Sequence, residues 1–213
     1  MTTKNQRALL VVCSLAAQGR KDLTWLYRGL EVGGVALADH VLGKLYGTSA
    51  DLQGNDVTAT SIVQALGDLA TSGTVTAVDV IWMTHGEPDD LIFDNGEAVT
   101  ASDLADSIVQ AGMPNVLRAL YSTACFGATH NAQWLRAGFK VVTGARKVNA
   151  NSATEFPVVI QHWGGGDSFA DSISIGDNPS TRWFWDQAAK KMRFAGVDSR
   201  KLVAGDGSLS INS

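Results

Sequence analysis

The chain has 213 residues, of which 45% are apolar and 18% are charged, and its formal net charge is −4. This composition is typical of a globular protein that buries a full core without disulfides or structural metals. The lysines and arginines are scattered, which disfavours nucleic acid as a partner. No apolar run is long enough to span a bilayer, so we expect no membrane partner. Because there is no repeat, linker or low-complexity tract, we expect one domain over residues 1–213.

The two cysteines, Cys13 and Cys125, are too few for a disulfide scaffold and indicate free thiols. Free thiols are typical of a reducing compartment, so a cytoplasmic location is expected. The N-terminal apolar run is followed by a polar stretch at 18–22 without a small-residue cleavage site, which disfavours a secretory signal. Cys13 lies inside this run and is predicted to be a core residue.

In the first half of the chain, residues 8–15 form a continuous apolar run, the pattern of a strand covered on both faces. Residues 36–45 show helical spacing, and 47–56 are predicted to be a polar, turn-rich connection. An amphipathic helix follows over 58–70. Residues 77–83 predict a second buried strand, which ends on His-Gly.

In the middle of the chain, residues 91–99 predict a small hairpin around an Asn-Gly turn. A helix is predicted over 101–110, capped by Thr100 and closed by Gly112 and Pro114. The apolar residues 116–124 then predict a third buried strand, which ends on a cysteine.

The last third of the chain begins with a predicted helix over 128–137 and a fourth strand over 139–144. The next helix is predicted over 153–163, with Pro157 in its first turn, where proline is tolerated. The pattern at 169–175 fits either a strand or a helix. Two further segments complete the chain: an amphipathic helix with three aromatic residues at 179–193 and a hairpin-like tail at 201–212.

Strands and helices alternate along the chain, which is typical of an α/β sandwich with a mostly parallel sheet. In such folds, ligands bind at the carboxyl ends of the strands. His85 and Cys125 follow two of the predicted buried strands. If these strands are parallel neighbours, the two side chains meet at the same edge of the sheet.

Cys125 and His85 have the chemistry of a nucleophile and its acid–base partner. Because Cys125 precedes a predicted helix, we expect the helix N-terminus to lower the thiol pKa. The backbone N–H groups of Gly86 and Cys125 are candidates for an oxyanion hole, since a glycine after the histidine lets an acyl group approach. Taken singly, a buried structural thiol and a hydrogen-bonded loop histidine are the commoner outcomes. Their pairing at two strand ends favours the catalytic interpretation.

The segments Met83–Gly86 (M-T-H-G) and Ser122–Gly127 (S-T-A-C-F-G), each at the end of an apolar strand, resemble the caspase-like (clan CD) cysteine peptidases. That family includes caspases, metacaspases, legumain, gingipain and CHAT domains. The resemblance covers roughly residues 75–170 and implies a three-layer α/β/α sandwich of caspase-like topology. It further implies a Cys–His dyad in which Cys125 forms a thioester and His85 acts as acid and base, with no third residue required.

The resemblance also implies where substrate specificity would be set. Thr123 stands two residues before the nucleophile, where metacaspases carry aspartate and caspases glutamine, so an acidic or amide floor is missing there. Arg20 or Asp22, after the first strand, are alternative sources of a charged floor. The loop after the fourth strand would line the same pocket, and its candidates are Ala145, Arg146 and Lys147. Each of these charges is also explained as a solvated loop residue, so specificity stays open.

The predicted function is therefore hydrolysis of a peptide or protein substrate by a cysteine endopeptidase, without a metal or cofactor. A second hypothesis is a caspase-fold regulatory or binding module that has no peptidase turnover. A nucleotide-binding α/β protein is disfavoured because the glycine fingerprint is missing. A zinc site is disfavoured because the spacing of the histidines and cysteines matches no zinc pattern.

Overall fold

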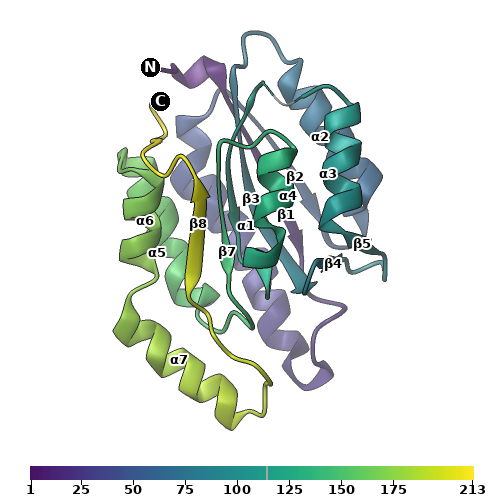
Figure 1. The fold of residues 1–213 in the computed structure, drawn as a ribbon, viewed down its shortest axis with the longest axis vertical. Coiled ribbons are helices and arrows are strands. Elements are labelled where there is room, and N and C mark those ends of the chain that lie inside the picture. Colours follow the sequence, from purple (N-terminus) through teal and green to yellow (C-terminus); the bar gives the residue numbers. More distant parts are fainter. Residues whose placement is uncertain (114) are drawn as a thin grey trace.

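The computed structural model describes every residue of the chain except residue 114, and a central sheet organises it (Figure 1). The strands lie in the order β2 (Thr48–Gln53), β1 (Arg7–Ser14), β3 (Ala77–Glu87), β6 (Leu117–Ser122), β7 (Val141–Ala145) and β8 (Lys201–Gly205). All neighbours in this order are parallel except β7 and β8, which are antiparallel. A hairpin of β4 (Asp90–Ile92) and β5 (Ala98–Thr100) continues from the end of β3. The predicted helix-closing Pro114 lies outside the described residues.

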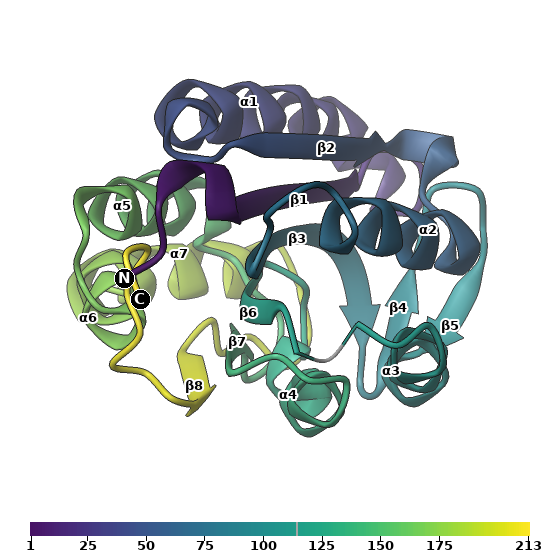
Figure 2. The same ribbon diagram turned by 90° about the horizontal axis from the view of Figure 1, so that it is seen from above.

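Helices cover both faces of the sheet (Figure 2). One face packs against α1 (Thr24–Leu42), α5 (Ser152–Gly165) and α6 (Phe169–Gly176). The other packs against α2 (Ala59–Ala70), α3 (Ala101–Gln110) and α4 (Gly127–Arg136). Among the described residues, the remaining helix is α7 (Pro179–Lys191), and four short 3₁₀ turns span Lys4–Gln6, Lys21–Leu23, Gly43–Leu45 and Gly54–Asp56. The predicted three-layer α/β/α sandwich is confirmed.

The two cores follow from the alternation of side chains along buried strands. In β1, Leu10 and Val12 enter the core beneath α2 and α3. Leu9, Val11 and Cys13 enter the core beneath α1 and α5. All are buried, which explains the continuous apolar run and confirms Cys13 as a core residue.

Several predicted elements differ from the structure. Residues 47–56 are not simply a turn-rich connection, because 48–53 form the edge strand β2, whose polar side chains reach solvent. Helix α1 begins at Thr24, twelve residues before the predicted start, because glycines interrupt its apolar pattern. Pro157 lies inside α5 and not in its first turn, because the helix begins at Ser152. Residues 169–176 are helical, and the tail is no hairpin, since 201–205 pair with β7.

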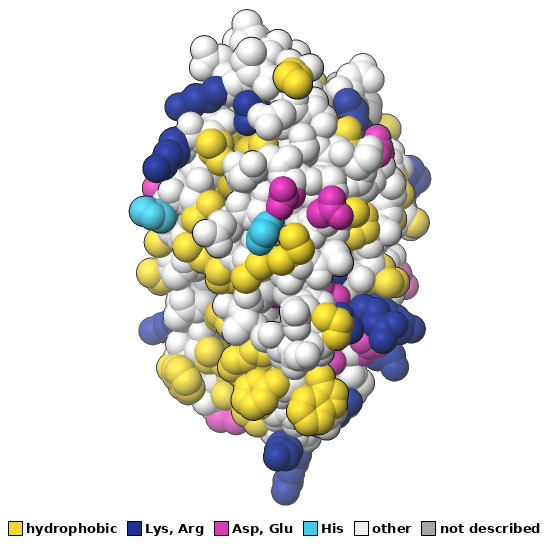
Figure 3. All heavy atoms as spheres, turned by 90° about the vertical axis from the view of Figure 1, so that its left-hand side faces the viewer, with side chains coloured by type: hydrophobic (Ala, Val, Ile, Leu, Met, Phe, Trp, Pro, Cys, Tyr) yellow, Lys and Arg dark blue, Asp and Glu magenta, His cyan; other side chains and the backbone are white. Residues whose placement is uncertain are grey.

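The aromatic residues of α7 do not belong to the core. Trp183 and Phe184 are 65% and 58% exposed. Large hydrophobic side chains gather toward the lower end of the face shown in Figure 3, the end at which Figure 1 places α7. None of the described helices is both long and apolar enough to cross a membrane.

A buried ion pair joins two central strands near their amino-terminal ends. Arg118 on β6 lies 2.6 Å from Asp79 on β3, and their side chains are 3% and 5% exposed. Tyr46 donates to the same carboxylate at 2.5 Å, and Arg118 also donates to the carbonyl of Ile211 at 2.8 Å. The pair therefore ties the sheet to the C-terminal tail.

Arg118→Met is expected to reduce the free energy of unfolding by about 3–5 kcal/mol, because it leaves the Asp79 carboxylate buried without its partner. Urea denaturation measures this change. Arg136→Met is the matched control: Arg136 pairs with Asp106 on the surface, where losing the pair is expected to cost less than about 1 kcal/mol. Equal losses in the two variants would contradict the structural role of the buried pair.

Candidate active site

The parallel register of three strands brings the predicted site residues to one edge of the sheet. Ser14 on β1 is level with Thr84 on β3, so the residues that follow them, Leu15 and His85, are neighbours. Trp82 on β3 is level with Ser122 on β6. His85 and Cys125 each lie three positions beyond this second pair. The expectation that β3 and β6 are parallel neighbours is confirmed.

The His85 ring is oriented by a backbone carbonyl. Its Nε2 lies 2.8 Å from the carbonyl oxygen of Leu15. A carbonyl only accepts, so Nε2 carries the hydrogen, and in the neutral ring Nδ1 is left as an acceptor. Burial lowers the pKa of His85, which favours this neutral form. The ring edge packs against Tyr27, with ring centroids 5.0 Å apart.

Two carboxylates hold the loop that supplies this carbonyl. Glu31 on α1 accepts hydrogen bonds from the N–H groups of Leu15 and Ala16, at 2.9 and 3.1 Å. Asp94, between β4 and β5, accepts a further bond from Ala16 at 3.1 Å. The Leu15 carbonyl is therefore fixed in position before it meets His85. No sequence pattern marks the Leu15 carbonyl as part of the site, because every residue has a carbonyl.

Cys125 lies in the tight turn between β6 and α4. Phe126 adopts a left-handed conformation with φ of 56° and forms the N-cap of α4. The turn packs directly on β7, since a Cβ on Gly144 would come within 2.2 Å of the Gly127 backbone. The predicted order of strand, cysteine, turn and helix is confirmed, with the helix starting at Gly127.

Gly86 is required by the contact between the two turns. A Cβ at this position would lie 2.5 Å from the carbonyl oxygen of Cys125, closer than any side chain tolerates. The role expected of Gly86 is to let an acyl group approach, and its contact with the Cys125 turn is a second reason for a glycine at this position. Among the described hydrogen bonds, the backbone N–H of Cys125 donates to none.

The Cys125 thiol is held by Asn149. The backbone N–H of Asn149 donates to Sγ at 3.4 Å, and its side-chain amide donates to the carbonyl of Thr123 at 2.9 Å. Burial nevertheless raises the thiol pKa above its ordinary value, although the Asn149 N–H and the charge of Lys201 oppose this shift. The expectation of a lowered thiol pKa is therefore wrong, because desolvation outweighs the N–H groups near the thiol. No described hydrogen bond joins Cys125 to His85.

A buried charge pair lies beneath this turn. The Lys201 ammonium, at the start of β8, donates to the carbonyl of Ser122 at 2.6 Å and lies 3.5 Å from the Glu155 carboxylate. Tyr121 donates to the same carboxylate at 3.1 Å. Burial raises the pKa of Glu155 to about 7. This cluster was not predicted from the sequence, because nothing in the local pattern marks a lone lysine or glutamate as buried.

Three of the four charges predicted to set specificity are paired on the surface. Arg20 and Asp22 are exposed and bind each other at 2.5 Å. Arg146 is also exposed and lies 3.2 Å from Asp198. Of the two further candidates, Ala145 is the last residue of β7 and is buried, and Lys147 lies two residues beyond it and is exposed. Thr123 lines a cavity at the carboxyl ends of the strands, and none of these other candidates lines that cavity.

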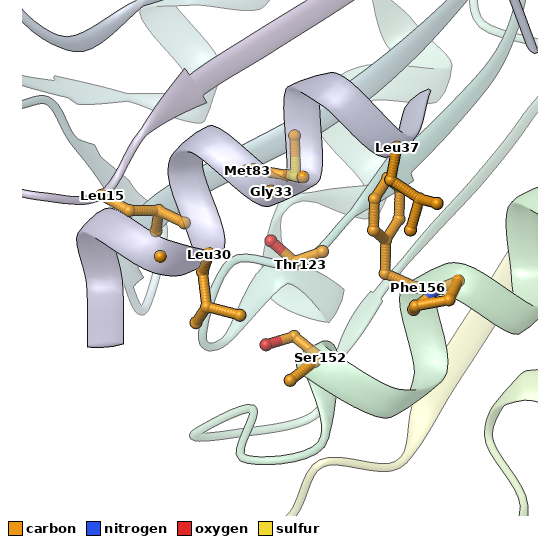
Figure 4. Close-up of a pocket in the computed structure, with 12 residues that line it drawn as sticks. Leu15, Leu30, Gly33, Leu37, Met83, Thr123, Ser152 and Phe156 are labelled. Atoms are coloured by element: carbon orange, nitrogen blue, oxygen red, sulfur yellow. The ribbon is translucent and has the colours of Figure 1, made fainter. Parts of the chain in front are cut away.

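That cavity lies between α1 and α5, at the carboxyl ends of the strands (Figure 4). Its volume is about 210 Å³. The strand ends contribute Leu15, Met83 and Thr123, and the helices contribute Leu30, Gly33, Leu37, Ser152 and Phe156. The cavity is therefore built mainly from apolar side chains.

Comparison with known proteins defines the fold class. No protein-family model matches the chain, and no curated protein is a significant match. Among solved structures, caspase-1 from Spodoptera frugiperda has a TM-score of 0.63 at 10% identity, over 96% of this chain and 88% of the other. The Drosophila initiator caspase Dronc has a TM-score of 0.53 at 13% identity, over 99% and 85%.

A third similar structure is a secreted C11 cysteine protease from Bacteroides thetaiotaomicron, solved with an irreversible peptide inhibitor. Its TM-score is 0.58 at 13% identity, over 94% of this chain and 66% of that protein. The chain therefore has the caspase-like fold. The structure places His85 and Cys125 at the end of the sheet where the sequence analysis expected a site.

The raised thiol pKa predicts the reactivity of Cys125. In a Cys13→Ala background, the rate of iodoacetamide alkylation should still be rising above pH of about 10, where an ordinary thiol with a pKa of about 8.5 has levelled off. The double variant Glu155→Gln/Lys201→Met should move the profile to higher pH, because it removes a cation that favours the thiolate. A rate that has levelled off by pH of about 10, as for an ordinary thiol, would contradict this prediction.

The raised pKa of Glu155 predicts how stability depends on pH. Between about pH 5 and about pH 8 the folded protein holds this proton more tightly than the unfolded chain, so the Glu155 contribution to the free energy of unfolding falls as pH rises. The same double variant lacks this contribution. Its free energy of unfolding should therefore increase relative to that of the natural protein as the pH rises through this range. Urea denaturation across the pH range measures the difference, and a constant difference would contradict the assignment.

Proposed function

We propose that the chain is a cysteine endopeptidase, with Cys125 as nucleophile and His85 as acid and base. The observation that carries this proposal is the shared strand-end position of the two residues, with the His85 ring held by the Leu15 carbonyl. This contact leaves Nδ1 free to exchange a proton. The similar structures include two caspases and a cysteine protease bound to a peptide inhibitor, which supports the reaction class.

The proposed reaction starts from a neutral thiol and a neutral imidazole, since burial disfavours the charged form of both. As Sγ of Cys125 attacks the peptide carbonyl, the thiol proton passes to His85. The backbone N–H groups of Cys125 and Gly86 donate to the developing oxyanion. His85 then protonates the leaving amine as the C–N bond breaks, which leaves a thioester. His85 next removes a proton from water, whose attack releases the acid and restores the thiol.

The second candidate function is a caspase-fold regulatory or binding module. It is favoured by the raised pKa of the Cys125 thiol and by the lack of a described Cys125–His85 hydrogen bond. Catalytic hydrogen bonds often tighten only when substrate binds, so this geometry is compatible with either function. Labelling with a peptidyl electrophile separates the two, because a thiol that does not react favours the module.

Cys125→Ala is expected to abolish peptide cleavage, and His85→Ala to reduce it by at least about 10²-fold, because each removes one half of the proposed dyad. Mass spectrometry of a digested peptide library measures cleavage, and circular dichroism checks that each variant is folded. Cys13→Ala is the matched control, since that thiol is buried in the core and should leave cleavage intact. Full activity in either dyad variant would exclude the mechanism.

A further inference from the structure

We propose that the cavity between α1 and α5 binds the substrate side chain that precedes the cut bond, and that it selects an uncharged, apolar side chain. This inference rests on the proposed peptidase function. It adds the class of substrate side chain that precedes the cut bond, which the sequence alone leaves open.

The position of the cavity connects it to the dyad through three of its walls. Leu15 lines the cavity while its carbonyl holds the His85 ring. Met83 and Thr123 line it as well, each two residues before a dyad residue. A peptide with one side chain seated in the cavity would therefore lie close to the two strand ends that carry the dyad.

The chemistry of the lining favours an apolar occupant. Leu30 and Leu37 face Phe156 across the cavity, and of the described residues that line it none is charged (Figure 4). The hydroxyl groups of Thr123 and Ser152 are its polar side-chain groups. A carboxylate or ammonium group would lose its water here without gaining an opposite charge, whereas an apolar side chain gains from leaving water.

The charged residues predicted to set specificity do not line the cavity. Arg20 neutralises Asp22, and Arg146 pairs with Asp198, all outside the cavity. A substrate carboxylate would have to compete for an arginine that already has a partner, or reach Lys147, which is exposed and does not line the cavity.

The dimensions of the cavity fit one side chain. Its volume of about 210 Å³ is below that of pockets that enclose a whole small-molecule ligand. The floor is close to α1, because a Cβ on Gly34 would come within 2.8 Å of the Met83 sulfur. At the exposed rim, a Cβ on Gly33 meets no atom within 4 Å. A larger residue at Gly33 can therefore narrow the cavity without a clash.

The first test uses peptidyl electrophiles that differ only in the residue next to the reactive group: leucine, phenylalanine, aspartate or arginine. Intact-mass spectrometry follows the adduct on Cys125 in a Cys13→Ala background. The leucine and phenylalanine probes are expected to react about ten- to a hundredfold faster than the charged probes. A rate for the aspartate or arginine probe that equals or exceeds the leucine rate would overturn the inference.

The second test fills the cavity. Gly33→Leu is expected to slow the leucine and phenylalanine probes at least about tenfold, while iodoacetamide, which needs no pocket, keeps its rate. Gly165→Leu is the matched control: it makes the same substitution in α5, outside the cavity, at another position with no atom within 4 Å of the new Cβ. Loss of probe reactivity in both variants, or in neither, would overturn the role of the cavity.

Peptide hydrolysis by the same protein separates this inference from the proposed function. If the probes keep the apolar preference but no peptide is hydrolysed, the peptidase function fails and the cavity assignment stands. If peptides are cut after acidic or basic residues, the function stands and the cavity assignment fails. Absence of labelling by every probe would overturn both.

Discussion

Leu15 lies one residue beyond β1, and its carbonyl oxygen is already fixed where the His85 ring meets it. The two carboxylates of Glu31 and Asp94 bind the N–H groups of this loop, so the carbonyl cannot turn away without leaving them unsatisfied. The hydrogen bond from Nε2 then fixes the orientation of the His85 ring and leaves Nδ1 available for proton transfer. The rest of the site is arranged around this contact, since Cys125 approaches from the neighbouring strand end.

Burial acts on the two members of the dyad in opposite directions. It raises the pKa of Cys125 and lowers the pKa of His85, so both groups are neutral in the resting protein. Charge separation is then favoured only when the donors around a bound carbonyl compensate for it, which links reactivity to substrate binding. Lys201, buried beneath the same turn, carries a positive charge that opposes the rise in thiol pKa.

Local signals predicted those elements whose ends are set by neighbouring residues. The helix α3 has the predicted bounds because Thr100 caps it, with its hydroxyl accepting from the N–H of Asp103. The helix α2 starts one residue after its predicted first residue, Thr58, because Thr58 instead caps it and makes the equivalent contact. The strand β2 was missed, because an edge strand with solvent on its outer side needs no apolar run.

The sequence by itself determined the layered α/β fold and nominated His85 and Cys125, because apolar strands that alternate with helices leave polar strand ends on one edge. Only the tertiary structure decided what surrounds them. The Leu15 carbonyl and the buried Lys201–Glu155 pair come from segments far apart in the chain. Their effects depend on burial and distance, which a linear pattern does not encode, and desolvation reversed the expected direction of the thiol pKa.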